Sequence, residues 1–329
     1  MAEVIFHVGL PKTGTTYIQE MLAFNRDMLS SHNIRYHQIG TAKCACHWWF
    51  ATNFFDKPED YAPVKNAVNN EVSIEELRIR GLNSESSLAY EAMNYESVIL
   101  SAEQFFFLPE KVLRKIKSFF FELGVTIKIV VYIRDFYELA VSELNQKVKM
   151  GMGSLDELQS DLPVFNVKRH LETYVSVFGK DAVNLKNFSE LVERDVDIVD
   201  DFLSSFSSNT FELVKTKKFS NTSLSDKALR IIDNVNLHGF DAPAHSKVRD
   251  CLIESLALLD GGKFIPSKEA FQKLERKIEA DLDFLNTTFD FNFESTSIPT
   301  QKRKKATHSV SEEDFSLVLA NFLKKMKNL

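Results

Sequence analysis

The first twenty residues contain a short glycine loop of the kind that binds phosphate. A buried apolar strand is predicted at residues 4–8, a tight loop at residues 9–13, and a helix beginning between Thr13 and Thr15. Backbone N–H groups without partners and the helix dipole both face such a loop, so it favours an anion. We therefore expect a phosphate site with Lys12 as its cation and threonine hydroxyls capping the first turn of the helix.

The position of the lysine distinguishes between kinds of phosphate site. In the P-loop of nucleotide hydrolases, the pattern is G-x-x-x-x-G-K-[ST]. Gly9 and Gly14 keep the glycine spacing and Thr16 supplies the hydroxyl, but Thr15 stands where the lysine is required. Lys12 lies earlier in the loop. A kinase or ATPase without that lysine loses its main contact to the β- and γ-phosphates, so the pattern argues against one. A chance strand–turn–helix remains the structural alternative.

A second phosphate-binding pair is predicted where another strand ends. The strongest strand signal covers residues 125–133 and leads into Arg134, after which Asp135 is a natural cap for a helix reaching about residue 150. Ser142 follows Arg134 by eight residues, inside that helix. A planar guanidinium makes paired charge-assisted contacts to phosphate oxygens, and a hydroxyl adds one donor.

These two segments together resemble the sulfotransferases that use 3′-phosphoadenosine 5′-phosphosulfate (PAPS), in particular the bacterial carbohydrate type. In that family the loop lysine lies beside the bridging oxygen of the phosphosulfate and the loop holds the 5′-phosphate. The arginine and serine hold the 3′-phosphate. The resemblance therefore implies that Lys12 binds the cofactor and takes part in catalysis. It implies a cofactor-binding role for six further residues: Thr13, Gly14, Thr15, Thr16, Arg134 and Ser142.

The resemblance continues along the chain with one departure. Phe136 stands where many members carry proline, which only pre-sets the start of a helix and binds nothing. The order of the later segments is also similar to the family. It is a helix, a strand, Phe-Ser-Glu-Leu at residues 188–191, a helix, and Asn-x-Ser-Leu-Ser at residues 221–225. The likeness thus extends to about residue 237.

Two side chains are candidates for the catalytic general base. Glu103 follows a predicted buried strand at residues 97–101, and open α/β sheets place their ligands at the carboxyl ends of such strands. His47 is followed by two tryptophans, and histidine is a common base. Some relatives use a glutamate and others a histidine, so the sequence leaves both open. Without a catalytic role, Glu103 would be an acid that stabilises a helix N-terminus, and His47 would be a hydrogen-bonded histidine in an aromatic core.

One aromatic segment contains the candidates both for binding the acceptor and for binding a metal ion. His47 and Trp48 are candidates for binding the acceptor, because aromatic faces stack on sugar rings. Cys44, Cys46 and His47 also suggest zinc, but a structural zinc site needs a second ligand pair that the sequence lacks. No acid follows a strand as a magnesium ligand does in nucleoside triphosphatases. We expect no metal.

Composition narrows the class of protein. The chain has 329 residues, of which 44% are hydrophobic, so it can bury a large core. A net charge of −6 without a long basic block argues against nucleic acid, and no apolar run approaches the ~18 residues of a membrane span. The early loop leaves no room for a signal peptide, and three cysteines suit a reducing compartment. We expect a cytoplasmic protein.

The elements that must position these residues form an α/β architecture. We expect a P-loop-like three-layer fold with a central, mostly parallel sheet, helices on both faces and a helical C-terminal part. The chain would be a single sulfotransferase domain, residues 1–329, with the α/β core and cofactor site in residues 1–205 and a helical extension in residues 206–329. Other expected elements are a strand at residues 33–38, a proline-containing loop at 56–70, a capped helix at 73–94, a helix at 165–178, a strand at 182–186 and a helix from 187 to 206.

The function implied by the resemblance is sulfuryl transfer from PAPS to a hydroxyl, less commonly an amine, leaving adenosine 3′,5′-bisphosphate. The acceptor would be a small molecule or glycan, with a carbohydrate or glycolipid favoured. Two alternatives stay open: a P-loop kinase with a displaced lysine, and a nucleotide-binding protein without turnover. The basic run at residues 301–305 could close over the phosphates or be a solvated loop. The sequence does not determine the oligomeric state.

Overall fold

A computed structural model of the protein describes residues 2–38, 45–207, 211–215, 224–240, 243, 246–291 and 311–327. Cys44, the Asn-x-Ser part of the 221–225 motif and the basic run at 301–305 lie outside these residues. The elements named below belong to the described part of the chain.

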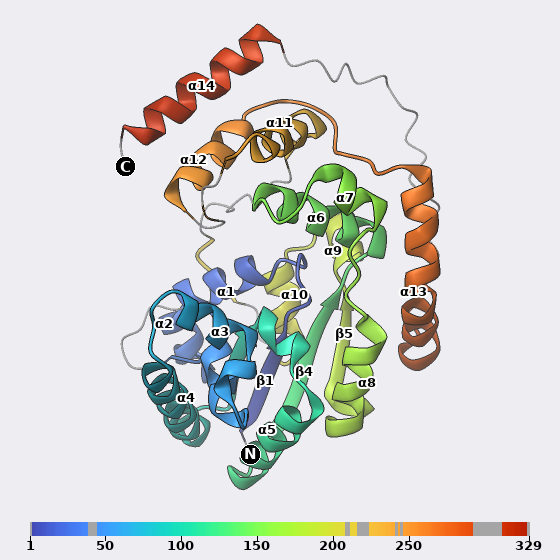
Figure 1. Cartoon of the computed structure of the whole chain (residues 1–329). Coiled ribbons are helices and arrows are strands. Elements are labelled where there is room, and N and C mark those ends of the chain that lie inside the picture. Colours follow the sequence, from blue (N-terminus) through green and yellow to red (C-terminus); the bar gives the residue numbers. More distant parts are fainter. Residues whose placement is uncertain are drawn as a thin grey trace. The chain divides into compact units, whose positions relative to one another are not determined.

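The centre of the fold is a sheet of five parallel strands in the order β2-β3-β1-β4-β5 (Figure 1). Their bounds are β1 Glu3–Val8, β2 Ile34–Tyr36, β3 Ser97–Ala102, β4 Thr126–Ile133 and β5 Val183–Asn187. β1 lies between β3 and β4, and Val8 pairs with Ala102 at the end of β3. Because the strands are parallel, the segments that follow β1, β3 and β4 leave the sheet at one edge.

Helices cover both faces of this sheet, so the expected α/β class is confirmed. On one face, Ile5, Ile99 and Tyr132 pack against α1 (Thr15–Phe24), α2 (Arg26–Ser31) and α10 (Ile198–Ser204). On the other face, the Phe6 ring stacks on Phe105 with 4.4 Å between centroids, beside α5 (Glu110–Glu122) and α8 (Val167–Phe178). The alternation of side chains along β1 thus serves two apolar layers.

The contacts between residues divide the chain into two compact units. The first contains the sheet and comprises residues 1–134 and 167–219, and the second comprises residues 135–166 and 220–329. The grouping differs from the sequence-based division at residue 205, because β4 leads into α6, which packs on helices from the C-terminal part.

The remaining elements of the first unit are short helices and one long one. They are η1 Trp48–Phe54, η2 Pro58–Asp60, α3 Ala62–Asn69, α4 Ile74–Asn94, η3 Glu103–Phe107, η4 Lys180–Ala182 and α9 Phe188–Glu193, where η marks a 3₁₀ helix. The expected cap of α4 is confirmed, since Ser73 accepts a hydrogen bond from the Glu76 amide. The aromatic segment that begins at Trp48 is a 3₁₀ helix, η1.

The second unit is helical, as expected for the C-terminal part. It contains α6 Phe136–Lys149, α7 Leu155–Ser160, α11 Asp226–Leu237, α12 Lys247–Leu256, α13 Lys268–Phe289 and α14 Glu312–Met326. The Arg249 guanidinium is buried and donates to the Lys149 carbonyl and to Asn236 Oδ1, both at 2.9 Å. Asp135 caps α6 as predicted, and Ser225 caps α11.

Two expectations about local structure were wrong. The segment 56–70 is largely helical, with Pro63 in the first turn of α3, where proline removes no helical hydrogen bond. The expected helix over 187–206 is two helices separated by Asp195, whose φ is 51°. After the glycine loop, α1 ends and α2 begins at Asn25, which caps both helices.

Candidate active site

The loop after β1 leaves the first turn of α1 open to an anion. Gly14 is the N-cap, with a left-handed φ of 76°, and no side chain caps the turn. The expected capping by threonine is therefore wrong. The buried Thr13 hydroxyl donates to the Leu10 carbonyl at 2.6 Å instead, and Thr16 is exposed. N-terminal N–H groups without a side-chain cap are the donors that a phosphate uses.

The loop also packs tightly against the end of β3. The Gly9 amide donates to the Ala102 carbonyl at 3.2 Å. A Cβ atom at Gly9 would overlap the Thr15 methyl group and lie 3.2 Å from Glu103 Cα. Only glycine fits this approach without a shift of the backbone. The first glycine of the motif thus brings the loop to Glu103.

Arg134 reaches the same loop from the end of β4. Its Nη1 donates to the Lys12 carbonyl at 3.0 Å, and its guanidinium lies 5.5 Å from the centre of the Phe188 ring. The same ring borders Gly14, since a Cβ there would lie 3.3 Å from Phe188 Cε2. The structure therefore brings together Arg134 and the Lys12 loop, which are more than a hundred residues apart in the chain.

Ser142 occupies the middle of α6, eight residues after Arg134, and is half-buried. Its helix belongs to the second unit, whereas Arg134 is the last residue of the sheet unit before it. Its role stays a prediction from the spacing.

Glu103 begins η3 immediately after β3 and is half-buried. The Thr15 hydroxyl donates a hydrogen bond to Glu103 Oε1. This bond fixes the carboxylate against the first turn of α1, next to the loop. The Glu103 carboxylate, a possible proton acceptor, therefore lies at the edge of the sheet where the loop and Arg134 meet.

His47 has a different environment. Its ring is buried, Nδ1 accepts a hydrogen bond from the Ser101 amide at 2.9 Å, and the ring centre lies 5.2 Å from that of His37. Burial, with smaller effects from His37 and Arg26, holds its pKa well below the usual value. An amide N–H can only donate, so Nδ1 is the acceptor and the proton of the neutral ring is on Nε2. The ring thus has no lone pair left for a substrate proton.

A second buried histidine, His7 on β1, was not selected from the sequence. Its Nδ1 lies 2.7 Å from Ser101 Oγ, which also accepts a hydrogen bond from Gln19 Nε2 at 3.1 Å. Burial lowers the pKa of His7 to about 3. The only sequence signal is a histidine inside an apolar strand, which points to a hydrogen-bonded core group. The network joins β1, β3 and α1 under the loop.

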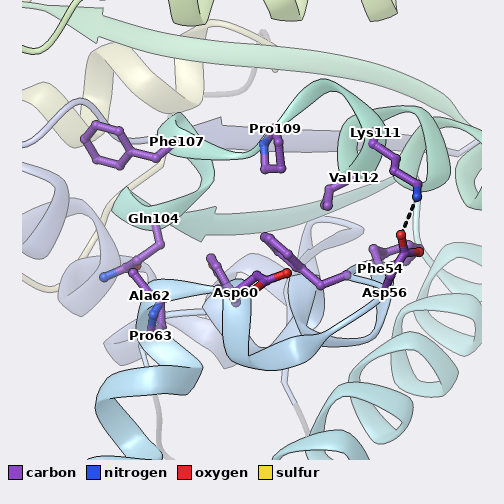
Figure 2. Close-up of a pocket in the computed structure, with 12 residues that line it drawn as sticks. Phe54, Asp56, Asp60, Ala62, Pro63, Gln104, Phe107, Pro109, Lys111 and Val112 are labelled. Atoms are coloured by element: carbon purple, nitrogen blue, oxygen red, sulfur yellow. Dashed lines mark hydrogen bonds and ion pairs between the residues drawn. The ribbon is translucent and has the colours of Figure 1, made fainter.

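Trp48 belongs to an aromatic group in the sheet unit. Its ring lies 5.3 Å from that of Trp49 and 6.2 Å from that of Tyr61, measured between centroids. Tyr61 lines a hollow of about 530 Å³ that also borders Gln104, the residue after Glu103 (Figure 2). Trp48 supports this hollow through Tyr61 and does not itself line it.

A second hollow, of about 570 Å³, flanks the other side of the loop. Gly14, Tyr17 and Phe188 line it together with residues of the α9–α10 connection. Tyr17 donates to Asp197 Oδ2 at 3.1 Å, and Lys215 pairs with the same carboxylate at 3.0 Å. The carboxylates make this hollow unsuited to a phosphate group, although its ring-lined wall begins at the phosphate loop.

The described residues contain neither a group that could hold a metal ion nor a helix that could span a membrane. Among them, no three or more His, Cys, Asp or Glu side chains are grouped so that they could hold a metal ion. Within the same ranges, no helix has both the length and the apolar character that crossing a membrane requires.

Among known proteins, the chain is similar to solved structures. No family model and no curated protein matches the sequence. Among solved structures, the chain is similar to the "Sulfotransferase Domain from the Curacin Biosynthetic Pathway", with 13% identity and a TM-score of 0.33. The alignment covers 85% of this chain and 98% of that domain.

Proposed function

We propose that the protein is a PAPS-dependent sulfotransferase. The observation that carries the proposal is the 3.0 Å hydrogen bond from Arg134 Nη1 to the Lys12 carbonyl. It supports the expectation that the phosphosulfate-type loop and the arginine after β4 serve one ligand. A nucleotide with phosphate at both the 5′ and 3′ positions needs two such cationic contacts.

The residues of this chain would divide the work of holding the donor. The uncapped first turn of α1 and the Lys12 ammonium would bind the 5′-phosphosulfate, and Arg134 would bind the 3′-phosphate. Ser142 would bind the 3′-phosphate together with Arg134, a role that rests on the eight-residue spacing in the sequence. PAPS supplies the activated sulfuryl group. Lys12 would stabilise the charge that develops on the bridging oxygen as the bond to sulfur breaks.

We assign the general base to Glu103. Its carboxylate is positioned by Thr15 beside the loop, whereas the His47 ring uses Nδ1 for the Ser101 amide and stays neutral. In the transfer, the acceptor hydroxyl gives its proton to Glu103 as its oxygen forms the bond to sulfur. The bridging S–O bond breaks, and adenosine 3′,5′-bisphosphate leaves with that electron pair.

The test is calorimetric titration of the protein with adenosine 3′,5′-bisphosphate in the presence of EDTA. We expect binding without metal, and Arg134→Ala should weaken it roughly tenfold or more, the usual cost of a charged hydrogen bond to phosphate. Arg194→Ala is the matched control, because that arginine pairs with Glu190 on the exposed surface of the same unit.

Other results would favour the alternative functions. Binding of ATP that disappears with EDTA would indicate a kinase. Tight bisphosphate binding without transfer of label from PAPS to any hydroxyl or amine acceptor would indicate a nucleotide-binding protein without turnover. Equal affinities of Arg134→Ala and Arg194→Ala would remove Arg134 from the site.

A further inference from the structure

The hollow beside Gln104 has the size and lining of a site for a small organic molecule. Its volume of about 530 Å³ lies in the range of ligand pockets, roughly 300–1,000 Å³. Eight of its twelve lining residues are apolar or aromatic. They come from two stretches of the sheet unit, η1 through the start of α3 and η3 through the start of α5.

Aromatic rings form much of the wall. Phe55 and Tyr61 stack with 4.8 Å between their centroids and 18° between their planes. Tyr61 is 4% exposed, so its ring is fixed by packing. Phe107, at another part of the wall, is 44% exposed, and its ring packs edge-on against His170 with 5.3 Å between centroids. Flat, fixed rings favour a flat apolar guest.

Figure 2 shows where the polar groups of the hollow lie. Gln104 and Phe107 are at one end, and the Lys111–Asp56 ion pair is at the other. Lys115 also pairs with Asp56, at 2.7 Å, and hydrogen bonds from the two lysines hold the Asp56 pKa at about 2. The exposed Asp60 lies between the two ends, and its carboxylate disfavours an anionic guest along the wall.

We propose that this hollow binds the acceptor, and that the acceptor is a hydroxylated compound with an uncharged aromatic body. This inference rests on the proposed sulfotransferase function and replaces the carbohydrate acceptor that the resemblance favours. A sugar of this volume carries many hydroxyls that need partners, because buried polar groups without hydrogen bonds are costly. The wall between the two ends is mostly apolar and supplies few such partners.

The position of Gln104 gives the acceptor its direction. Its side-chain oxygen accepts from the Cys46 thiol at 3.7 Å, which orients the amide at this end of the hollow. Since Gln104 directly follows Glu103 in the chain, the hydroxyl of a bound aryl alcohol would lie at this end of the hollow, with its ring along the wall. The hydroxyl proton then passes to Glu103, the oxygen bonds to sulfur, and the bridging S–O bond breaks.

The experiment is a calorimetric titration of the full chain with 2-naphthol, in the presence of adenosine 3′,5′-bisphosphate, with maltose as the comparison ligand. We expect 2-naphthol to bind and maltose not to bind. Phe107→Ala should weaken 2-naphthol binding about threefold to tenfold, the usual contribution of one aromatic contact. Ala62→Phe should also weaken it, by filling the hollow from an exposed helix start.

Phe121→Ala is the matched control, because that phenylalanine is 82% exposed on α5 of the same unit and does not line the hollow. Equal losses in Phe107→Ala and Phe121→Ala, no 2-naphthol binding, or maltose binding that Phe107→Ala weakens would each overturn the inference. Adenosine bisphosphate binding in the same samples reports separately on the proposed function. If the nucleotide binds and 2-naphthol does not, only the acceptor class is wrong.

Discussion

Lys12 has the most direct role of any single residue in the proposed reaction. Its backbone is held in the left-handed region, with φ at 66°, and its carbonyl accepts from Arg134. These two features fix the main chain of the loop without using the ammonium group. The side chain is thus left for the transition state, where charge develops on the leaving oxygen.

We expect Lys12→Ala to lower kcat by about 10²–10³, as for other losses of one preorganised charge-stabilising group, with little loss of donor affinity. Steady-state kinetics with PAPS, together with bisphosphate titration, measure both quantities. A variant with normal kcat and weakened binding would show that Lys12 only holds the nucleotide.

Glu103 and His47 should respond in opposite ways to substitution. Glu103→Gln should lower kcat by about 10²–10⁴, because the base is lost while the Thr15 contact can persist. His47→Ala should keep most of kcat but lower the free energy of unfolding by about 1–3 kcal/mol, since the buried Ser101 amide loses its acceptor. Turnover and urea unfolding of both variants test the assignment. It is contradicted if His47→Ala is stable and inactive.

At the scale of the elements, Ser101 on β3 connects two buried histidines to the sheet. Its backbone binds His47, and its hydroxyl binds both His7 of β1 and Gln19 of α1. Both histidines have lowered pKa values, so the fold excludes their protonated forms. The edge of the sheet that carries the loop is therefore sensitive to acid.

Because the fold excludes the protonated forms of His7 and His47, the free energy of unfolding depends on pH. Unfolded His7 takes up a proton near pH 6.5, whereas the folded residue does so only near pH 3. The stabilisation from neutral His7 is thus complete above pH 6.5 and is lost as the pH falls towards 3, by up to about 1.4 kcal/mol per pH unit. His47 contributes in the same direction. His7→Gln should make the slope shallower by about one proton, measured by urea unfolding between pH 7 and 5. An unchanged slope would mean that His7 is not the titrating group.

For the whole molecule, the proposed 3′-phosphate pair consists of Arg134 and Ser142, which are eight residues apart in the chain. Arg134 ends one segment of the sheet unit, and Ser142 lies in the helix that follows. If both hold the same phosphate, their effects on bisphosphate affinity should not add. We expect a coupling of about 0.5–3 kcal/mol in the cycle of Arg134→Ala, Ser142→Ala and the double variant, measured by calorimetry. Ser160→Ala, at an exposed serine of the second unit, is the control. Additive effects would place Ser142 outside the phosphate site.

The sequence by itself determined the α/β class, the strands that lead into the two proposed phosphate-binding segments and several helix starts. These features depend on local patterns: apolar runs for β1 and β4, and side-chain caps such as Asp135, Ser73 and Ser225. It misread residues 56–70, because two prolines usually mark a loop but here begin short helices. Such a helix start is decided by packing that the local pattern does not contain.

Only the tertiary structure decided how the site is arranged. Glu103 and His47 looked equivalent in the sequence, but Thr15 binds the first and the Ser101 amide occupies the second. The contact of Arg134 with the Lys12 loop depends on strand order, since β1 and β4 are neighbours although they are far apart in the chain. Hydrogen bonds between distant segments and burial are properties of the folded chain, and they set which group can accept a proton.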